Sequence, residues 1–226
     1  MSRELKVWYP GAIYHVMSRG NHKNDIYIDS EDYIMFLKIL SFMKKRYNFK
    51  VHSLCLMTNH FHLLIETTDV SISRIMQHLL SNYSHYYNDA HDFEGHVFQG
   101  RYYSKIINDD NYLLEAIRYI HRNPVKASIV SKAEKYPYTS YREFLKTEYE
   151  LTFPGSILER LLNEITDLNR VKEYFGENKE KYRKFNEDRI SHQDAEAQIQ
   201  LDMKEDERGI PLYLMRRTKV TGTLEE

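Results

Sequence analysis

Two histidines separated by one residue give the clearest sign of chemistry in this sequence. His60 and His62 lie in residues 56–66, where apolar residues alternate as they do in a β-strand. Both imidazoles should therefore project from one face of that strand, while Phe61 and Leu63 point into a core on the other. Neutral imidazole is the commonest nitrogen ligand of protein-bound metals. The pair predicts half of a metal site, the alternative being two solvated surface histidines.

A second segment, residues 109–126, offers a reacting group to accompany the histidines. Its apolar residues recur at helical spacing, and one of two aspartates at its start can cap a helix that Pro124 should end at Asn123. Tyr119 and Asn123 are four residues apart, so they should share one flank of this helix, away from its apolar stripe. A phenol and an amide presented together suit a nucleophile and a metal ligand. The alternatives are a tyrosine at the edge of the core and an asparagine that only caps the helix.

The remaining elements should position these two segments. The expected strands are residues 12–19, 50–57, 60–67 and 96–107, and the expected helices are residues 30–48, 71–88 and 109–123. The order β-α-β-β-α-β predicts an α+β, ferredoxin-like fold, an antiparallel sheet with helices on one face. We expect the histidines on the other, open face.

Three motifs in this order resemble a known family. They are His60-Phe61-His62, the sequence Gly-His-Val-Phe-Gln-Gly-Arg-Tyr at residues 95–102, and Tyr-Ile-His-Arg-Asn-Pro-Val-Lys-Ala at residues 119–127. Together they resemble the single-tyrosine HUH transposases, and most of all the branch associated with repetitive extragenic palindromes (REP). Residues 12–21 are similar to the first strand of that branch, and the resemblance covers about residues 8–130.

The resemblance implies a DNA transposition enzyme. Such an enzyme cleaves and rejoins single-stranded or hairpin DNA through a 5′-phosphotyrosine, with a divalent cation, Mg²⁺ or Mn²⁺, as cofactor. It implies that Tyr119 is the nucleophile and that His60, His62 and Asn123 hold the cation. Tyr112 lies on the same flank as Tyr119, and spacing alone could not choose between them.

Contacts to DNA should come from local groups, because the whole chain has a net charge of −1. Residues 1–130 hold 15 Lys and Arg against 13 Asp and Glu, a net charge of +2. The candidate phosphate contacts, each of which could instead be a solvated charge, are Arg101, Lys105, Arg118, Arg122 and Lys126. The candidate rings for stacking unpaired bases are Tyr86, Tyr87, Tyr102 and Tyr103.

Length and composition suggest three regions. We expect a catalytic domain at residues 1–130, a helical extension at 131–190 and a charged, partly disordered tail at 191–226. In the extension, residues 136–141 should pack back on the domain and residues 156–188 should form two helices around Gly176. The single cysteine, Cys55, should pack in the core.

The partner implied is DNA, and a homodimer is left open. No apolar run approaches the length of a membrane span, and the N-terminus lacks the apolar centre of a signal peptide. We therefore expect a soluble cytoplasmic protein, associated with the nucleoid when bound to DNA.

Two other functions stay open at this point. A relaxase or rolling-circle initiator shares the histidine pair and the tyrosine, although the short gap between motifs favours a transposase. A ferredoxin-like module that binds palindromes without catalysis is the alternative from another class. The presence of His60, His62, Tyr119 and Asn123 together favours a catalytic protein.

Overall fold

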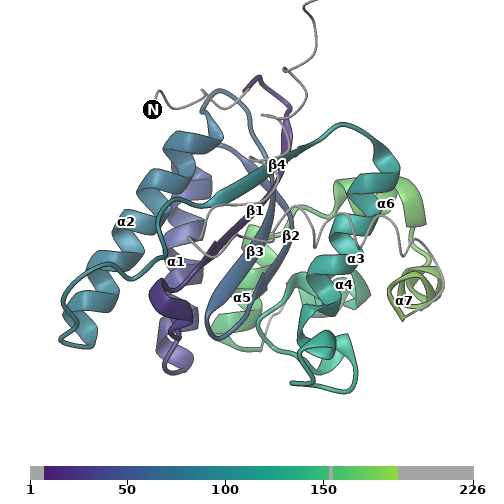
Figure 1. Cartoon of the computed structure of the whole chain (residues 1–226). Coiled ribbons are helices and arrows are strands. Elements are labelled where there is room, and N and C mark those ends of the chain that lie inside the picture. The colour runs from purple at the N-terminus through teal and green to yellow at the C-terminus, as the bar shows by residue number, and fades with distance from the viewer. Residues whose placement is uncertain (1–7, 153–154, 188–226) are drawn as a thin grey trace, which may run out of the picture.

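A four-stranded antiparallel sheet forms the centre of the molecule, in a computed structural model that describes residues 8–152 and 155–187. The strands are β1 (Ile13–Arg19), β2 (Lys50–Leu56), β3 (His60–Glu66) and β4 (Tyr103–Ile107), in the order β2-β3-β1-β4 (Figure 1). This arrangement confirms the predicted α+β, ferredoxin-like fold. The fourth strand is shorter than the expected 96–107, because residues before Tyr103 form a loop. Phe98 makes an isolated bridge to Gly20, and the Gln99 amide donates to the Arg19 carbonyl at 2.8 Å, but these bonds do not continue into a ladder.

One face of the sheet carries helices α1 (Ser30–Tyr47) and α2 (Ile72–Ala90), as predicted. The side chains of Phe61, Leu63 and Ile65 on β3 point toward these helices and are fully buried. Asp29 caps α1 in a capping box, which fixes where the helix begins and aims its apolar face at the sheet.

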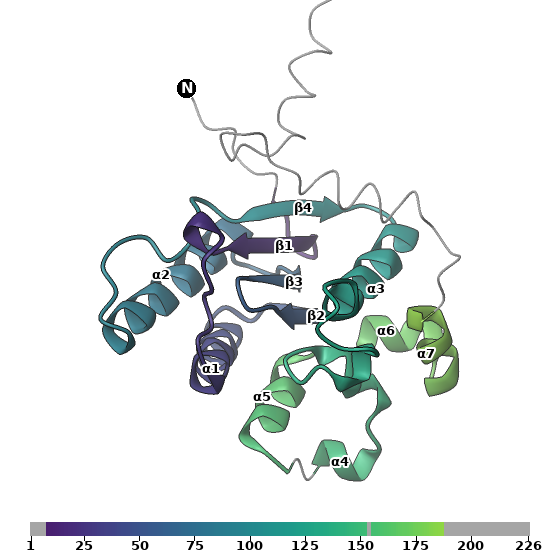
Figure 2. The ribbon, with the colours of Figure 1, turned by 60° about the horizontal axis from the view of Figure 1, so that its bottom comes forward.

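The opposite face is covered, so the expectation of an open histidine face is wrong. Helix α3 (Asp110–Lys126) lies across it, on the other side of the sheet from α1 and α2 (Figure 2). This face of the strands is also apolar, and its residues join the predicted stripe of α3 in a second core. The buried members from the strands and the stripe include Ile13, Cys55, Leu64, Ile107, Leu113, Ala116, Ile117 and Ile120. Cys55 packs there as expected.

Helix α3 extends beyond the predicted end at Asn123. Asp109 caps its start through a hydrogen bond from the Tyr112 amide, but the last turn runs through Pro124 to Lys126. Proline has no N–H to donate to the preceding turn, yet its fixed φ is compatible with a helix. The amide of Ala127 still donates to the Asn123 carbonyl at 2.9 Å, so Pro124 does not stop the helix where it stands.

The extension contains more helices than the two predicted around Gly176. They are α4 (Glu148–Thr152), α5 (Ile157–Ile165), α6 (Asn169–Phe175) and α7 (Lys179–Glu187), and Gly176 separates α6 from α7 with φ of 57°. Helix α5 packs on α1, whereas α6 and α7 join the core beneath α3. The predicted tail, residues 191–226, lies outside the described residues.

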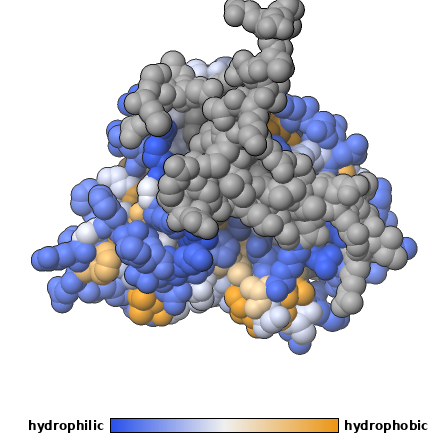
Figure 3. Space-filling view, in the orientation of Figure 1, coloured by the Kyte–Doolittle hydropathy of each residue, from blue (hydrophilic) through white to orange (hydrophobic). Residues whose placement is uncertain are grey.

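Residues 136–141 pack back on the sheet, as predicted. The Leu56 amide donates to the Tyr138 carbonyl at 2.9 Å, and the Tyr136 hydroxyl donates to the Leu56 carbonyl at 2.6 Å. This segment therefore satisfies the backbone of β2 at its outer edge. Within the described part of the chain, no helix is both long and apolar enough to cross a membrane, and most of the coloured surface in Figure 3 is hydrophilic.

Candidate active site

The histidine pair lies on the sheet face that α3 covers. His60 and His62 point to the same side of β3, with ring centroids 5.1 Å apart and ring planes perpendicular. His62 is 1% exposed, while His60, at the start of the strand, is half-buried. Alternation along β3 thus brings the two imidazoles together at the edge of the second core.

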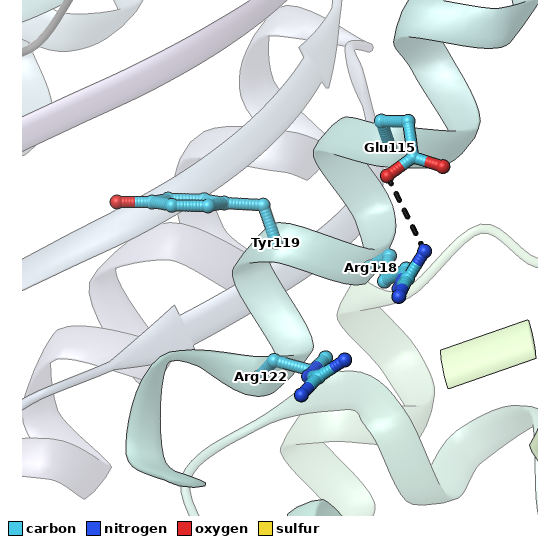
Figure 4. Close-up of a pocket in the computed structure, with 4 residues that line it drawn as sticks. All are labelled: Glu115, Arg118, Tyr119 and Arg122. Carbon is cyan, nitrogen blue, oxygen red and sulfur yellow. Dashed lines mark ion pairs between the residues drawn. The ribbon is translucent and has the colours of Figure 1, made fainter. Parts of the chain in front are cut away.

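Tyr119 extends from α3 to meet these histidines. Its ring centroid lies 5.5 Å from that of His62, edge to face, and the side chain is 9% exposed. The sequence suggested a flank away from the apolar stripe, but the ring is part of the buried surface. Figure 4 shows the Tyr119 hydroxyl on the opposite side of α3 from Arg118 and Arg122.

A third histidine, His15 on β1, completes the cluster and was missed by sequence reasoning. Its Nε2 lies 3.1 Å from Nδ1 of His62, and its ring centroid lies 6.0 Å from that of Tyr119. The register that pairs Met17 with His62 places His15 on the histidine face. Alternation within β1 could have shown which residues share a face with His15, but no sequence signal gives the register between the strands.

Asn59 contacts Nδ1 of His60, as His15 contacts Nδ1 of His62. Its Oδ1 lies 2.7 Å from Nδ1 of His60, and its Nδ2 donates to the Lys23 carbonyl at 3.1 Å. The asparagine therefore connects the first histidine of the pair to the turn that follows β1.

Asn123 lies one helical turn beyond Tyr119 and is 9% exposed. Its amide nitrogen donates to the Tyr119 carbonyl at 3.0 Å, so that bond does not use the side-chain oxygen that would serve as a ligand. Among the described residues, no group of three or more His, Cys, Asp or Glu side chains could hold a metal ion. The residues that could hold a cation are His60, His62 and Asn123, and two imidazoles with an amide oxygen suit a cation that takes its other ligands from phosphate and water.

Burial determines the protonation of these groups. It lowers the pKa of His60 to about 4, assisted by Arg19, and lowers the pKa of His62 well below its ordinary value. Burial also raises the pKa of Tyr119 to about 12. Near neutral pH the imidazoles are therefore uncharged, as metal ligands must be, and the phenol keeps its proton.

Three of the five predicted DNA-contacting cations lie on α3 near Tyr119. Lys126 has its Nζ 4.7 Å from the Tyr119 ring centroid. Arg118 and Arg122 line a depression together with Glu115 and Tyr119 (Figure 4), and both are close enough to Lys126 to lower its pKa. Arg118 is 4% exposed, and its Nη1 lies 3.6 Å from Oε2 of Glu115.

The other two predicted cations lie elsewhere. Lys105 on β4 lies over the ring of Tyr112, with Nζ 4.5 Å from the centroid. Arg101 precedes β4 and is exposed. The ammonium over the ring of the candidate nucleophile is that of Lys126.

The expectation that the candidate base-stacking rings are exposed is wrong for three of the four. Tyr87, Tyr102 and Tyr103 are each 7% exposed and belong to the packed interior or its edge. Tyr86 is half-buried and donates its hydroxyl to Asp32 at 3.0 Å. Aromatic residues are so frequent in this chain that helical and strand patterns could not separate exposed rings from packed ones.

A buried hydrogen-bond cluster around His121 joins α3 to the sheet and to the C-terminal helices. His121 lies within hydrogen-bonding distance of Ser53 on β2, through Nε2 at 2.9 Å, and of Tyr182 on α7, through Nδ1 at 3.0 Å. Ser140 lies 3.2 Å from the same Nε2. The helix that carries Tyr119 is therefore joined to the sheet and to the extension at one residue.

Comparison with known proteins identifies the family. Residues 9–123 match the family model described as "Transposase IS200 like", and this segment is half of the chain. The chain belongs to this family. The match begins just before β1 and ends at Asn123, so it includes the three histidines and Tyr119.

Two similar proteins are informative, one by its sequence and one by its fold. A Haemophilus influenzae protein described as a REP-associated tyrosine transposase is 25% identical over 115 residues, 46% of this chain and 65% of its own length. A REP-associated tyrosine transposase bound to a REP hairpin has a similar fold, with a TM-score of 0.57 and 17% identity over 70% of this chain and 93% of the other. The predicted family and fold are confirmed.

Proposed function

We propose that this transposase-family chain cleaves and rejoins single-stranded or hairpin DNA, with Tyr119 as the nucleophile. The observation that carries the proposal is the position of the Tyr119 ring. Its centroid lies 5.5 Å from the ring centroid of His62, on the sheet face that also carries His60. A phenol and two neutral imidazoles converge there from separate elements.

The proposed reaction conserves the phosphodiester bond energy. The Tyr119 oxygen bonds to a DNA phosphorus as the bond from that phosphorus to the 3′-oxygen breaks. The phenol proton leaves to solvent and the departing 3′-oxygen takes one up, which gives a 5′-phosphotyrosine and a free 3′-hydroxyl. Attack by a 3′-hydroxyl on the phosphotyrosine reverses these changes and rejoins the strand.

His60, His62 and the Asn123 side-chain oxygen would hold a divalent cation, Mg²⁺ or Mn²⁺. Such a cation neutralises charge on the scissile phosphate and favours the phenolate form of a tyrosine. That help is needed because burial raises the pKa of Tyr119 to about 12. The residues fit this task, since both imidazoles are kept uncharged by burial.

The DNA would enter along the flank of α3 that carries Tyr119 and Lys126. Lys126, whose ammonium lies over the Tyr119 ring, would contact a phosphate close to the one attacked. A hairpin with a single-stranded flank is the substrate to test first, because the relative of known structure is bound to a REP hairpin.

The decisive experiment is a search for a covalent adduct. The full chain is incubated with Mn²⁺ and a hairpin with single-stranded flanks, labelled at its 3′ end in one reaction and at its 5′ end in another. A denaturing gel should show a protein–DNA adduct with the 3′ label and a shortened free strand with the 5′ label. The adduct should be lost with Tyr119→Phe or EDTA and retained with Tyr112→Phe.

The other outcomes identify the alternatives. An adduct retained in Tyr119→Phe and lost in Tyr112→Phe would move the nucleophile to Tyr112. Specific hairpin binding with no adduct under any metal condition would contradict the proposal and favour a binding module without catalysis.

A further inference from the structure

In both histidines of the proposed cation site, Nδ1 is the ring nitrogen that contacts a neighbouring side chain. Nδ1 of His60 lies 2.7 Å from Oδ1 of Asn59, and Nδ1 of His62 lies 3.1 Å from Nε2 of His15. In each imidazole this contact leaves Nε2 as the nitrogen available for a cation.

The Asn59 contact determines where His60 carries its hydrogen. Nδ2 of Asn59 donates to the Lys23 carbonyl at 3.1 Å, so Oδ1 must be the atom that faces His60. An amide oxygen only accepts, and therefore Nδ1 of His60 donates. A neutral imidazole has one N–H, so Nε2 of His60 carries a lone pair.

The turn around Lys23 gives Asn59 a fixed partner. His22 and Lys23 both have positive φ, of 53° and 63°. A Cβ on Gly20 would lie 2.0 Å from the Asn24 carbonyl oxygen, so the chain closes this turn more tightly than another residue would allow. The Gly20 amide also donates to the Asn59 carbonyl at 2.8 Å.

The His15 contact can hold His62 in the same form. One of the two facing nitrogens must carry the shared hydrogen. When Nδ1 of His62 donates to Nε2 of His15, Nε2 of His62 has the lone pair that a cation needs. His15 is 1% exposed on a central strand, so water is not in place to substitute for it.

We propose that Asn59 and His15 are positioning residues, which hold His60 and His62 as Nδ1–H tautomers and aim both Nε2 atoms at the cation. This inference rests on the proposed function, because it assigns the orientation of the same cation site. Each acts through the histidine it contacts.

The first test examines the metal-free full chain. Nitrogen-15 NMR of labelled histidines distinguishes the two neutral tautomers by the shifts and couplings of the ring nitrogens. We expect His60 and His62 to show protonated Nδ1 and unprotonated Nε2 before any metal is added. An Nε2–H tautomer at His60 would overturn the positioning role of Asn59, and one at His62 would overturn that of His15.

The second test measures Mn²⁺ affinity by calorimetric titration without DNA. His15→Leu and Asn59→Ala should each weaken binding about 10- to 100-fold, the usual effect of losing a partner of a metal-bound histidine. His15→Gln and Asn59→Asp retain an acceptor oxygen and should recover most of the affinity. The control is His52→Gln, which changes a buried histidine paired with Glu66 on the same sheet.

The outcomes separate this inference from the function beneath it. If wild-type Mn²⁺ binding is unchanged by His60→Ala, the proposed cation site itself fails. If His60→Ala abolishes binding while folded His15→Leu and Asn59→Ala bind like the wild type, only the positioning roles are wrong. Should His15→Leu not fold, the wild-type tautomers and His15→Gln still decide the question.

Discussion

The Lys126 ammonium lies over the ring of Tyr119, 4.7 Å from its centroid, although the two residues are two helical turns apart. Burial, together with the nearby Arg122 and Arg118, lowers the pKa of Lys126 to about 8. Helix α3 therefore carries both the candidate nucleophile and an amine beside its ring, and this amine loses its proton more readily than an exposed lysine does. The net charge of −1 gives no indication of this local arrangement.

Removing this charge should weaken DNA binding. Lys126→Ala is expected to lower hairpin affinity and to reduce the dependence of log K on log salt concentration by about 1, the effect of losing one phosphate contact. Fluorescence anisotropy over a range of salt concentrations measures both. Lys38→Ala, an exposed lysine on the helix behind the sheet, is the matched control. Equal salt slopes for the two variants would show that Lys126 does not contact phosphate.

Tyr119→Phe should separate chemistry from folding. The adduct should fall below detection, whereas hairpin affinity should change less than about twofold and the free energy of unfolding by less than about 1 kcal/mol, since only one hydroxyl is removed. Adduct gels, anisotropy and urea denaturation provide the three readouts. A variant that loses binding and adduct together would instead give Tyr119 a role in holding DNA.

Helix α3 should be loosened by Tyr182→Phe. The change removes the partner of Nδ1 in the fully buried His121, and a buried polar atom without a partner costs about 1–3 kcal/mol. Urea denaturation should show this loss of stability. Tyr9→Phe is the control because Tyr9 is exposed and precedes β1. Equal stability of the two variants would mean that α7 does not hold α3 through this bond.

Stability should decrease as the solution is acidified below pH 6.5. Burial lowers the pKa of His15 and of His121 to about 3 and that of His60 to about 4, so these groups stay neutral in the folded chain. The unfolded chain takes up their protons below pH 6.5, which makes the unfolding free energy fall until the folded pKa values are reached.

Urea midpoints measured between pH 6.5 and about pH 5 isolate this effect, because most carboxyl groups titrate at lower pH. His121→Gln should show a smaller dependence on pH than the wild type, since one of the neutral buried histidines is gone. A wild-type midpoint that is constant over this interval would contradict the burial of these histidines.

Local sequence patterns predicted the parts of the fold that depend on local periodicity. Alternation along residues 60–66 correctly predicted a strand with His60 and His62 on one face, and helical spacing correctly predicted the buried stripe of α3. The choice of Tyr119 over Tyr112 as nucleophile came from the family resemblance and stays a prediction.

Features that depend on distant pairings were not predictable in this way. The role of His15 follows from the register of β1 against β3, and no residue of β1 encodes that register by itself. The covered second face was missed because α3 lies more than forty residues after β3 and its stripe gives no sign of which surface it will meet. The burial of Tyr87, Tyr102 and Tyr103 was not predicted, because aromatic residues are frequent in this chain and local patterns do not separate packed rings from exposed ones.

The order of the strands has a consequence for hydrogen exchange. His15, His60 and His62 all lie on β1 and β3, which are the two inner strands and have neighbours on both sides. Backbone amides in such strands exchange with solvent only when the sheet opens, whereas a helix resting on its surface can open locally. The slowest-exchanging backbone amides should therefore be those of β1 and β3 around the histidines. The amides of α3, which carries Tyr119, should exchange sooner. Local opening of α3 would then displace Tyr119 and leave the histidine cluster intact.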